Sequence, residues 1–187
     1  MGIEVIARDW DRPGWCGSFY PEDLPEDWRL TYFANAFEAV LVPALAWQSV
    51  PWEHLAAWRE DVPQRFRFYL ELAQDQAPAT LARAAQALGE GFAGSVAAVC
   101  PGPTVVGANA DPDAEATRTW SAWGRDGTPI LARRLPDALL SEPPAAVAWL
   151  RGMAAEARSR PALAVFGEGP ADSLTRWSQL VLLAGLA

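Results

Sequence analysis

The stretch Ile3-Glu4-Val5-Ile6-Ala7 is a short, mainly apolar run that is followed at once by polar and aromatic residues. Apolar runs of about four to eight residues are typical of buried β-strands. Five further runs of this kind occur along the chain, at residues 39–43, 66–72, 95–100, 129–133 and 162–166. The sequence therefore predicts at least six strands.

Helical patterns fill most of the gaps between these runs. Within residues 27–37 the apolar side chains recur at the spacing of one helix face, namely Leu30, Phe33, Ala34 and Phe37. Similar patterns predict helices at residues 52–60, from Pro78 to Gly89, at 143–159 and at 173–186.

A strand followed by a helix about every thirty residues is the signature of βα units with parallel strands. We therefore predict a single α/β domain over residues 1–187. An eight-unit barrel takes at least about 200 residues, so we expect a reduced barrel or an open parallel sheet of six strands, or of seven if residues 104–108 form one. Residues 117–123 fit either a helix or, with the turn signal Asp126-Gly127, one strand of a hairpin.

Composition excludes several classes of enzyme. All fifteen basic residues are Arg, so the chain has no lysine for a Schiff base or a phosphate-binding loop. His54 is the only histidine, and the two cysteines, Cys16 and Cys100, are too few for a zinc site. We therefore predict no metal centre and no cofactor, although a hard-cation site built from carboxylates stays open.

The charge and the apolar segments bear on partners and location. A net charge of −8 repels a phosphate backbone, so we expect no nucleic-acid partner. The longest apolar stretch, residues 180–187, is shorter than the ~20 residues that cross a bilayer. Because the first residues also lack the features of a secretory signal, we expect a cytoplasmic protein without membrane contact.

The loop after the first run carries a resemblance to a known family. The segment Trp10-Asp11-Arg12-Pro13-Gly14-Trp15-Cys16-Gly17-Ser18-Phe19-Tyr20-Pro21 resembles the opening signature of the YecE-like family, also called domain of unknown function 72. The similarity is good over about residues 3–75, including Phe66-Arg67-Phe68, and weaker over 160–185. It implies a TIM-like β/α barrel, here in a shortened form, and no assigned activity.

The chain also departs from the pattern of that family. Leu41 and Pro43 stand where the relatives' second strand has Glu and Asn, and Glu71 stands at the position that is usually Lys, which reverses the charge. The first strand's small Gly-Thr-Ser-Gly run is replaced by Ile6-Ala7-Arg8-Asp9. An active site that the relatives hold at these strand ends would be rebuilt or lost in this protein.

Functional groups of β/α barrels lie at the carboxyl ends of the strands, which converge on one mouth. This rule selects nine polar or aromatic residues, which also include Gln48, Asp111, Arg133 and Glu168, and five of them are the candidate ligand-binding residues: Asp9, Trp10, Tyr20, Trp47 and Glu71. The aromatic rings would let a sugar-like or planar ligand stack, and the carboxylates would orient it. Helix capping for the carboxylates and core packing for the rings are the structural alternatives.

Two functions of different classes follow. The favoured hypothesis is a non-catalytic interaction or scaffold module, because the family's polar positions are lost. The alternative is a small-molecule-binding or hydrolytic barrel with its site at the strand ends. Since an incomplete barrel leaves strand edges uncovered, we also expect a homodimer.

Overall fold

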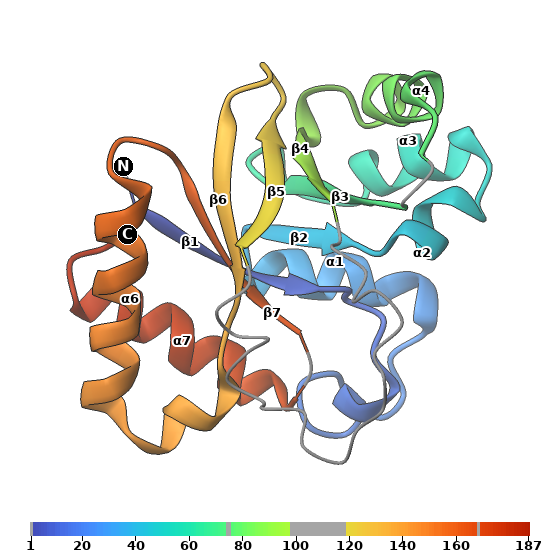
Figure 1. Cartoon of the computed structure of the whole chain (residues 1–187). Helices are drawn as coiled ribbons and strands as arrows, with labels where there is room; N and C mark the ends of the chain where they lie inside the picture. The colour runs from blue at the N-terminus through green and yellow to red at the C-terminus, as the bar shows by residue number, and fades with distance from the viewer. Residues whose placement is uncertain (1, 74–75, 98–118, 168) are drawn as a thin grey trace, which may run out of the picture.

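Seven strands close into a barrel in the computed structural model of the chain, which describes residues 2–73, 76–97, 119–167 and 169–187 (Figure 1). In barrel order the strands are β1 (Ile3–Arg8), β2 (Ala39–Val42), β3 (Arg67–Leu72), β4 (Phe92–Ala97), β5 (Thr119–Gly124), β6 (Pro129–Arg134) and β7 (Ala162–Phe166). All six strands predicted from apolar runs are present. The fold is a reduced TIM-like β/α barrel with fewer than eight strands in the described residues, as predicted.

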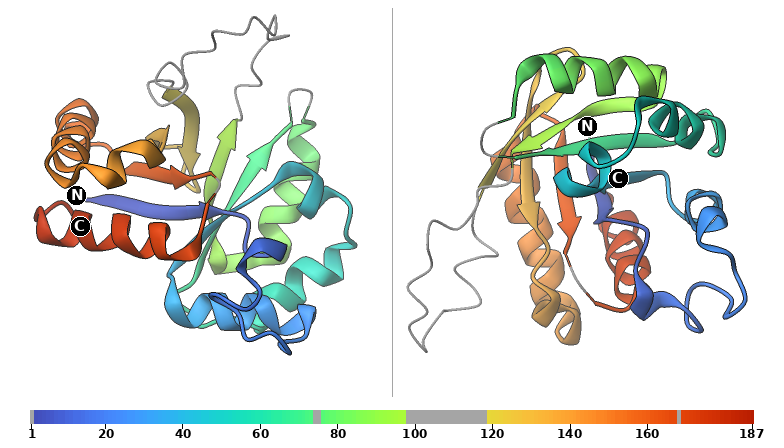
Figure 2. Two further views of the ribbon diagram at one scale, coloured as in Figure 1. Left: turned by 90° about the horizontal axis from the view of Figure 1, so that it is seen from below. Right: turned by 90° about the vertical axis from the view of Figure 1, so that its right-hand side faces the viewer.

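Helices cover the barrel on the side of β2 to β4 and on the side of β7 and β1 (Figure 2). The α-helices are α1 (Arg29–Ala36), α2 (Ala44–Gln48), α3 (Trp52–Glu60), α4 (Pro78–Leu88), α6 (Pro143–Ala157) and α7 (Ala171–Leu183). Short 3-10 turns lie at Pro13–Trp15, Glu26–Trp28, Gly89–Gly91 and Asp137–Ser141. None of the helices in the described part of the chain is long and apolar enough to cross a membrane.

The expectation of a wholly parallel sheet is wrong for β5. This strand pairs antiparallel with both β4 and β6, and β5 and β6 form the hairpin that the sequence offered as one of two alternatives. Gly127 has a φ of 80°, which favours glycine, and the Asp126 carboxylate accepts a hydrogen bond from the Thr128 N–H at 2.9 Å. The hairpin thus supplies two neighbouring strands without a helix between them. The possible strand at 104–108 lies outside the described residues.

Two apolar clusters separate the inside of the barrel from its outside. The inner one joins all seven strands, through residues such as Ile6, Leu41, Tyr69 and Val165. The outer one packs the strands against the helices and contains most of the large aromatic rings. Each described strand has a neighbour on both sides of it in the closed barrel, so the premise of an uncovered edge strand does not hold, although the first half of β1 lacks a partner residue in β2. The homodimer itself stays a prediction.

Three fully buried tryptophans of the outer cluster differ in how their indole N–H groups are used. Trp15 donates to the Gly169 carbonyl at 2.9 Å, and Trp47 donates to the Glu71 carbonyl at 2.8 Å. Trp177, which packs beside Trp149 at 6.1 Å between ring centroids, has no partner for its N–H among the described residues. Only the first two therefore combine packing with a buried hydrogen bond.

We predict that replacement by phenylalanine separates these positions. All three changes remove similar volume, but Trp15→Phe and Trp47→Phe also delete a hydrogen bond. They should lower the free energy of unfolding by about 1 kcal/mol more than Trp177→Phe does. Urea unfolding followed by circular dichroism measures this difference. Equal losses at the three positions would show that the two indole hydrogen bonds contribute nothing to stability.

Candidate functional site

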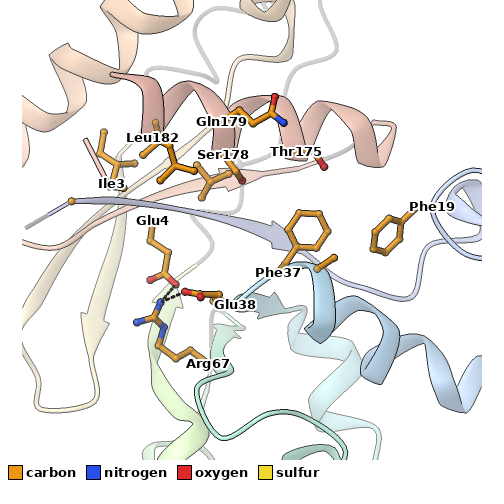
Figure 3. Close-up of a pocket in the computed structure, with 16 residues that line it drawn as sticks. Ile3, Glu4, Phe19, Phe37, Glu38, Arg67, Thr175, Ser178, Gln179 and Leu182 are labelled. Carbon is orange, nitrogen blue, oxygen red and sulfur yellow. Dashed lines mark hydrogen bonds and ion pairs between the residues drawn. The ribbon is translucent and has the colours of Figure 1, made fainter. Parts of the chain in front are cut away.

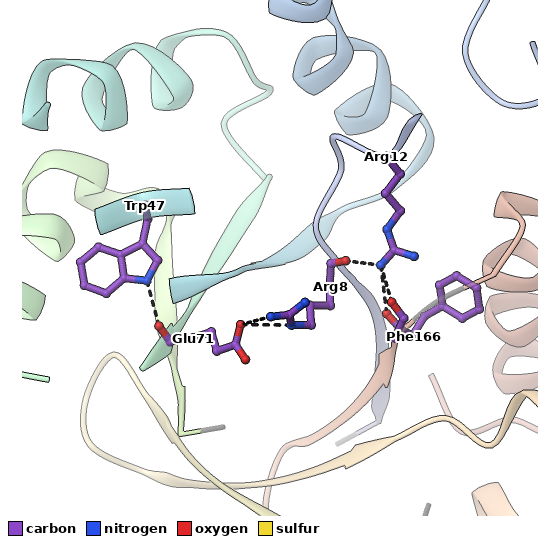
Figure 4. Close-up of polar contacts among 6 residues, drawn as sticks. Arg8, Arg12, Trp47, Glu71 and Phe166 are labelled. Atoms are coloured by element: carbon purple, nitrogen blue, oxygen red, sulfur yellow. Dashed lines mark hydrogen bonds and ion pairs between the residues drawn. The ribbon is translucent and has the colours of Figure 1, made fainter. Parts of the chain in front are cut away.

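Glu71 lies on β3 near the carboxyl end of the barrel and is 9% exposed. Its Oε2 accepts two hydrogen bonds from Arg8, at 3.0 Å from Nε and 2.8 Å from Nη2 (Figure 4). Arg8 is the last residue of β1, so the pair reaches across the short strand β2. The Arg8 side chain remains 43% exposed. The carboxylate predicted from the sequence is therefore present at the mouth, where a guanidinium already holds it.

Asp9 follows directly in the chain and adopts a φ of 77°, which is unusual for a residue with a side chain. Its backbone N–H donates to the Leu41 carbonyl at 2.9 Å, and its Oδ1 accepts from the Asp11 N–H at 3.0 Å. The side-chain bond stabilises the turn that begins the loop after β1. Burial raises the pKa of the Asp9 carboxyl, and the hydrogen bonds and Arg12 only partly oppose that rise.

The three aromatic candidates are buried and do not line an open mouth. Trp47 is 0% exposed and lies against β3 through its bond to the Glu71 carbonyl. The Tyr20 hydroxyl donates to the Trp10 carbonyl at 2.5 Å, and the Trp10 ring packs edge-on against Trp58 at 4.9 Å. These contacts argue against a ligand that stacks on the rings. The ligand-binding role of the five residues stays a prediction, and it rests on Glu71 and Asp9.

Arg12 connects the loop after β1 to the end of β7. It was not among the residues predicted from the sequence. Its guanidinium lies 4.8 Å from the Trp15 ring centroid and 5.5 Å from that of Phe166. It also donates to the Gly167 carbonyl at 2.7 Å and to the Arg8 carbonyl (Figure 4). Arg12 thus fixes the geometry from which Arg8 reaches Glu71.

A second ion pair joins the same two strands at the amino end of the barrel. Arg67 of β3 donates to Glu4 of β1 at 2.7 Å, and the Tyr69 hydroxyl donates to the other Glu4 oxygen at 3.0 Å. Burial raises the pKa of Glu4, while Arg67 and Tyr69 oppose the rise. Glu4 and Arg8 lie on one face of β1, and Arg67 and Glu71 on one face of β3, because side chains alternate along a strand.

The remaining candidates for metal or nucleophilic chemistry are scattered. Within the described ranges, no group of three or more His, Cys, Asp or Glu side chains is placed to hold a metal ion. His54 lies exposed on α3, and Cys16 is an exposed free thiol. Cys100 falls outside the described residues.

The fold and the contacts at the carboxyl ends of the strands define a reduced β/α barrel in which arginine side chains connect the strand ends. The model of the family described as "Protein of unknown function DUF72" matches residues 7–105, which is more than half of the chain. The chain belongs to this family, and the resemblance drawn from the Trp10 to Pro21 segment is confirmed. No curated protein and no solved structure matches the chain.

The raised pKa of Asp9 predicts a pH-dependent difference in stability between the wild type and Asp9→Asn. Above its ordinary pKa of 3.8 the carboxyl is ionised in the unfolded chain, while burial disfavours ionisation in the folded state. The Asp9 carboxyl therefore makes the folded wild type less stable as the pH rises through and above 3.8, and Asn, which keeps the acceptor for the Asp11 N–H, removes this contribution. Urea unfolding at a series of pH values should show that the free energy of unfolding of Asp9→Asn increases relative to that of the wild type as the pH rises. A difference between the two proteins that does not change with pH would refute the inference.

Proposed function

We propose that this chain is a non-catalytic binding module in which the barrel serves as a rigid scaffold. The observation that carries the proposal is the use of Glu71, whose carboxylate accepts two hydrogen bonds from Arg8 and whose backbone carbonyl accepts the Trp47 indole N–H. A general acid or base must exchange a proton with its substrate. Glu71 instead forms contacts within the protein that hold β1, β3 and α2 together.

Two further observations support this proposal. The loop after β1 stabilises the end of β7, because Arg12 contacts the Gly167 carbonyl and the Phe166 ring. The aromatic residues retained from the family signature, Trp15 and Tyr20, are buried and bond to backbone carbonyls. The residues that resemble the family signature thus stabilise the fold, as a scaffold role requires.

A panel of hydrolysable chromogenic substrates tests the proposal against the hydrolytic alternative. We expect the wild type to release no nitrophenol from nitrophenyl glycosides, esters or phosphates above the rate in buffer. Turnover that Glu71→Gln abolishes and that Glu53→Gln preserves would overturn the proposal. Glu53 is a suitable control because it lies exposed at the start of α3, and the change removes the same charge.

Small-molecule binding at the carboxyl ends of the strands is the second candidate. One observation favours it, namely that the Arg8 side chain is 43% exposed while it is paired with Glu71. An anionic ligand could therefore reach it from solvent and form charge-assisted hydrogen bonds. A thermal-shift screen of carboxylate and phosphate metabolites tests this candidate, with Arg8→Gln as the site variant and the exposed Arg65→Gln as control. A hit that survives Arg8→Gln would place the ligand elsewhere.

A further inference from the structure

A pocket of about 750 Å³ lies at the opposite, amino end of the barrel, between β1, the start of β2 and α7 (Figure 3). Pockets that hold small molecules in proteins measure roughly 300–1,000 Å³. The residues at the carboxyl-end mouth do not line it. Whatever binds here is independent of the function proposed above and goes beyond it.

The register of the sheet explains why this end of the barrel is open. β1 begins at Ile3, but it pairs with β2 only through Ala7 with Val40 and Arg8 with Leu41. On its other side β1 pairs with β7 from Ile3 onward. The first half of β1 therefore has no β2 residue opposite it, and side chains of Glu4, Glu38 and Arg67 meet in the gap.

One part of the pocket wall is apolar and partly exposed. Phe19 and Phe37 are half-buried and lie 5.6 Å apart between ring centroids. Leu182 of α7 is 65% exposed and faces the same space (Figure 3). A water-filled pocket with such a wall gains free energy when an apolar group displaces the water.

The charged end of the pocket carries two carboxylates and one guanidinium. Arg67 lies 2.7 Å from Glu4 and 3.9 Å from Glu38, so its close contact is with Glu4. Arg65 reaches Glu38 at 3.8 Å, but both side chains are about two-thirds exposed and Arg65 is not part of the lining. An ion pair of that kind contributes little. Burial is the main cause of the raised pKa of Glu4, and the charge of Glu38 adds to the rise, while Arg67 and Tyr69 oppose it.

Polar groups on α7 complete the lining. The hydroxyls of Thr175 and Ser178 donate to the Ala171 and Leu174 carbonyls of their own helix, at 3.4 and 3.0 Å. Each hydroxyl oxygen can still accept a hydrogen bond from a donor in the pocket. The lining thus offers acceptors and negative charge beside an apolar wall.

We propose that this pocket binds an amphipathic organic cation. Its apolar or aromatic body packs against Phe19, Phe37 and Leu182. Its ammonium group lies near Glu38 and Glu4 and donates to their carboxylates. Arg67 stays paired with Glu4, and the ligand supplies a cation beside Glu38, whose two guanidinium neighbours, Arg65 and Arg67, lie 3.8 and 3.9 Å away.

Three probes with the same ring and different charge test the ligand class: naphthylethylamine, naphthylethanol and naphthylacetate. Isothermal titration calorimetry on the full chain should give the highest affinity for the amine and the lowest for the acetate. Raising the salt concentration should lower the affinity for the amine and leave the affinity for the alcohol unchanged, since salt screens exposed charges. Equal affinity for amine and acetate, or no binding of the amine, would overturn the proposal.

Two variants at exposed positions locate the site without endangering the fold. Glu38→Gln should lower the affinity for the amine by about 2- to 5-fold and leave the affinity for the alcohol unchanged. Leu182→Ser should weaken all three probes, on the order of threefold. The controls are Glu53→Gln and Leu183→Ser, since Leu183 is 85% exposed and outside the pocket. Amine binding that neither site variant changes would also overturn the proposal.

Discussion

Two ion pairs of opposite polarity join β1 to β3 across β2, one at each end of the barrel. At the amino end Glu4 accepts from Arg67, and at the carboxyl end Arg8 donates to Glu71. Between the pairs, Ile6 and Tyr69 belong to the apolar inner cluster. Because β2 has only four residues, its backbone pairs with only part of β1 and of β3. The charged side chains connect these two strands directly. The interior is thus an apolar layer with an ion pair at either end.

The two ends nevertheless differ because of register. At the carboxyl end β1 and β2 are paired, so Arg8 and Glu71 meet over a closed sheet, and Arg12 fixes the adjoining loop. At the amino end β1 extends beyond β2, and a pocket opens beside the Glu4–Arg67 pair. The register, with a second strand shorter than the first, therefore accounts for paired strands at one end and a candidate ligand site at the other.

The sequence predicts the elements of this barrel better than its directions and contacts. Apolar runs located β2 and β7, since burial on both faces leaves a continuous signal. The direction of β5 was not predicted, because residues 117–123 also fitted a helix and only Asp126-Gly127 indicated a hairpin. Trp47 was placed correctly after a strand, but position along a chain does not reveal whether a ring turns inward. Arg8 was missed as a partner of Glu71 because their pairing depends on register between strands 63 residues apart.

Charge reversal at the carboxyl end tests most directly whether the cross-barrel pairs hold the fold. The free energies of unfolding of Arg8→Glu, Glu71→Arg and the double variant give the coupling between the two side chains, which we predict to be about 1–3 kcal/mol in favour of the double variant. The same exchange at the exposed pair Arg65 and Glu38, 3.8 Å apart, should give a coupling below about 1 kcal/mol. A double variant at Arg8 and Glu71 whose loss equals the sum of the two single losses would contradict the account.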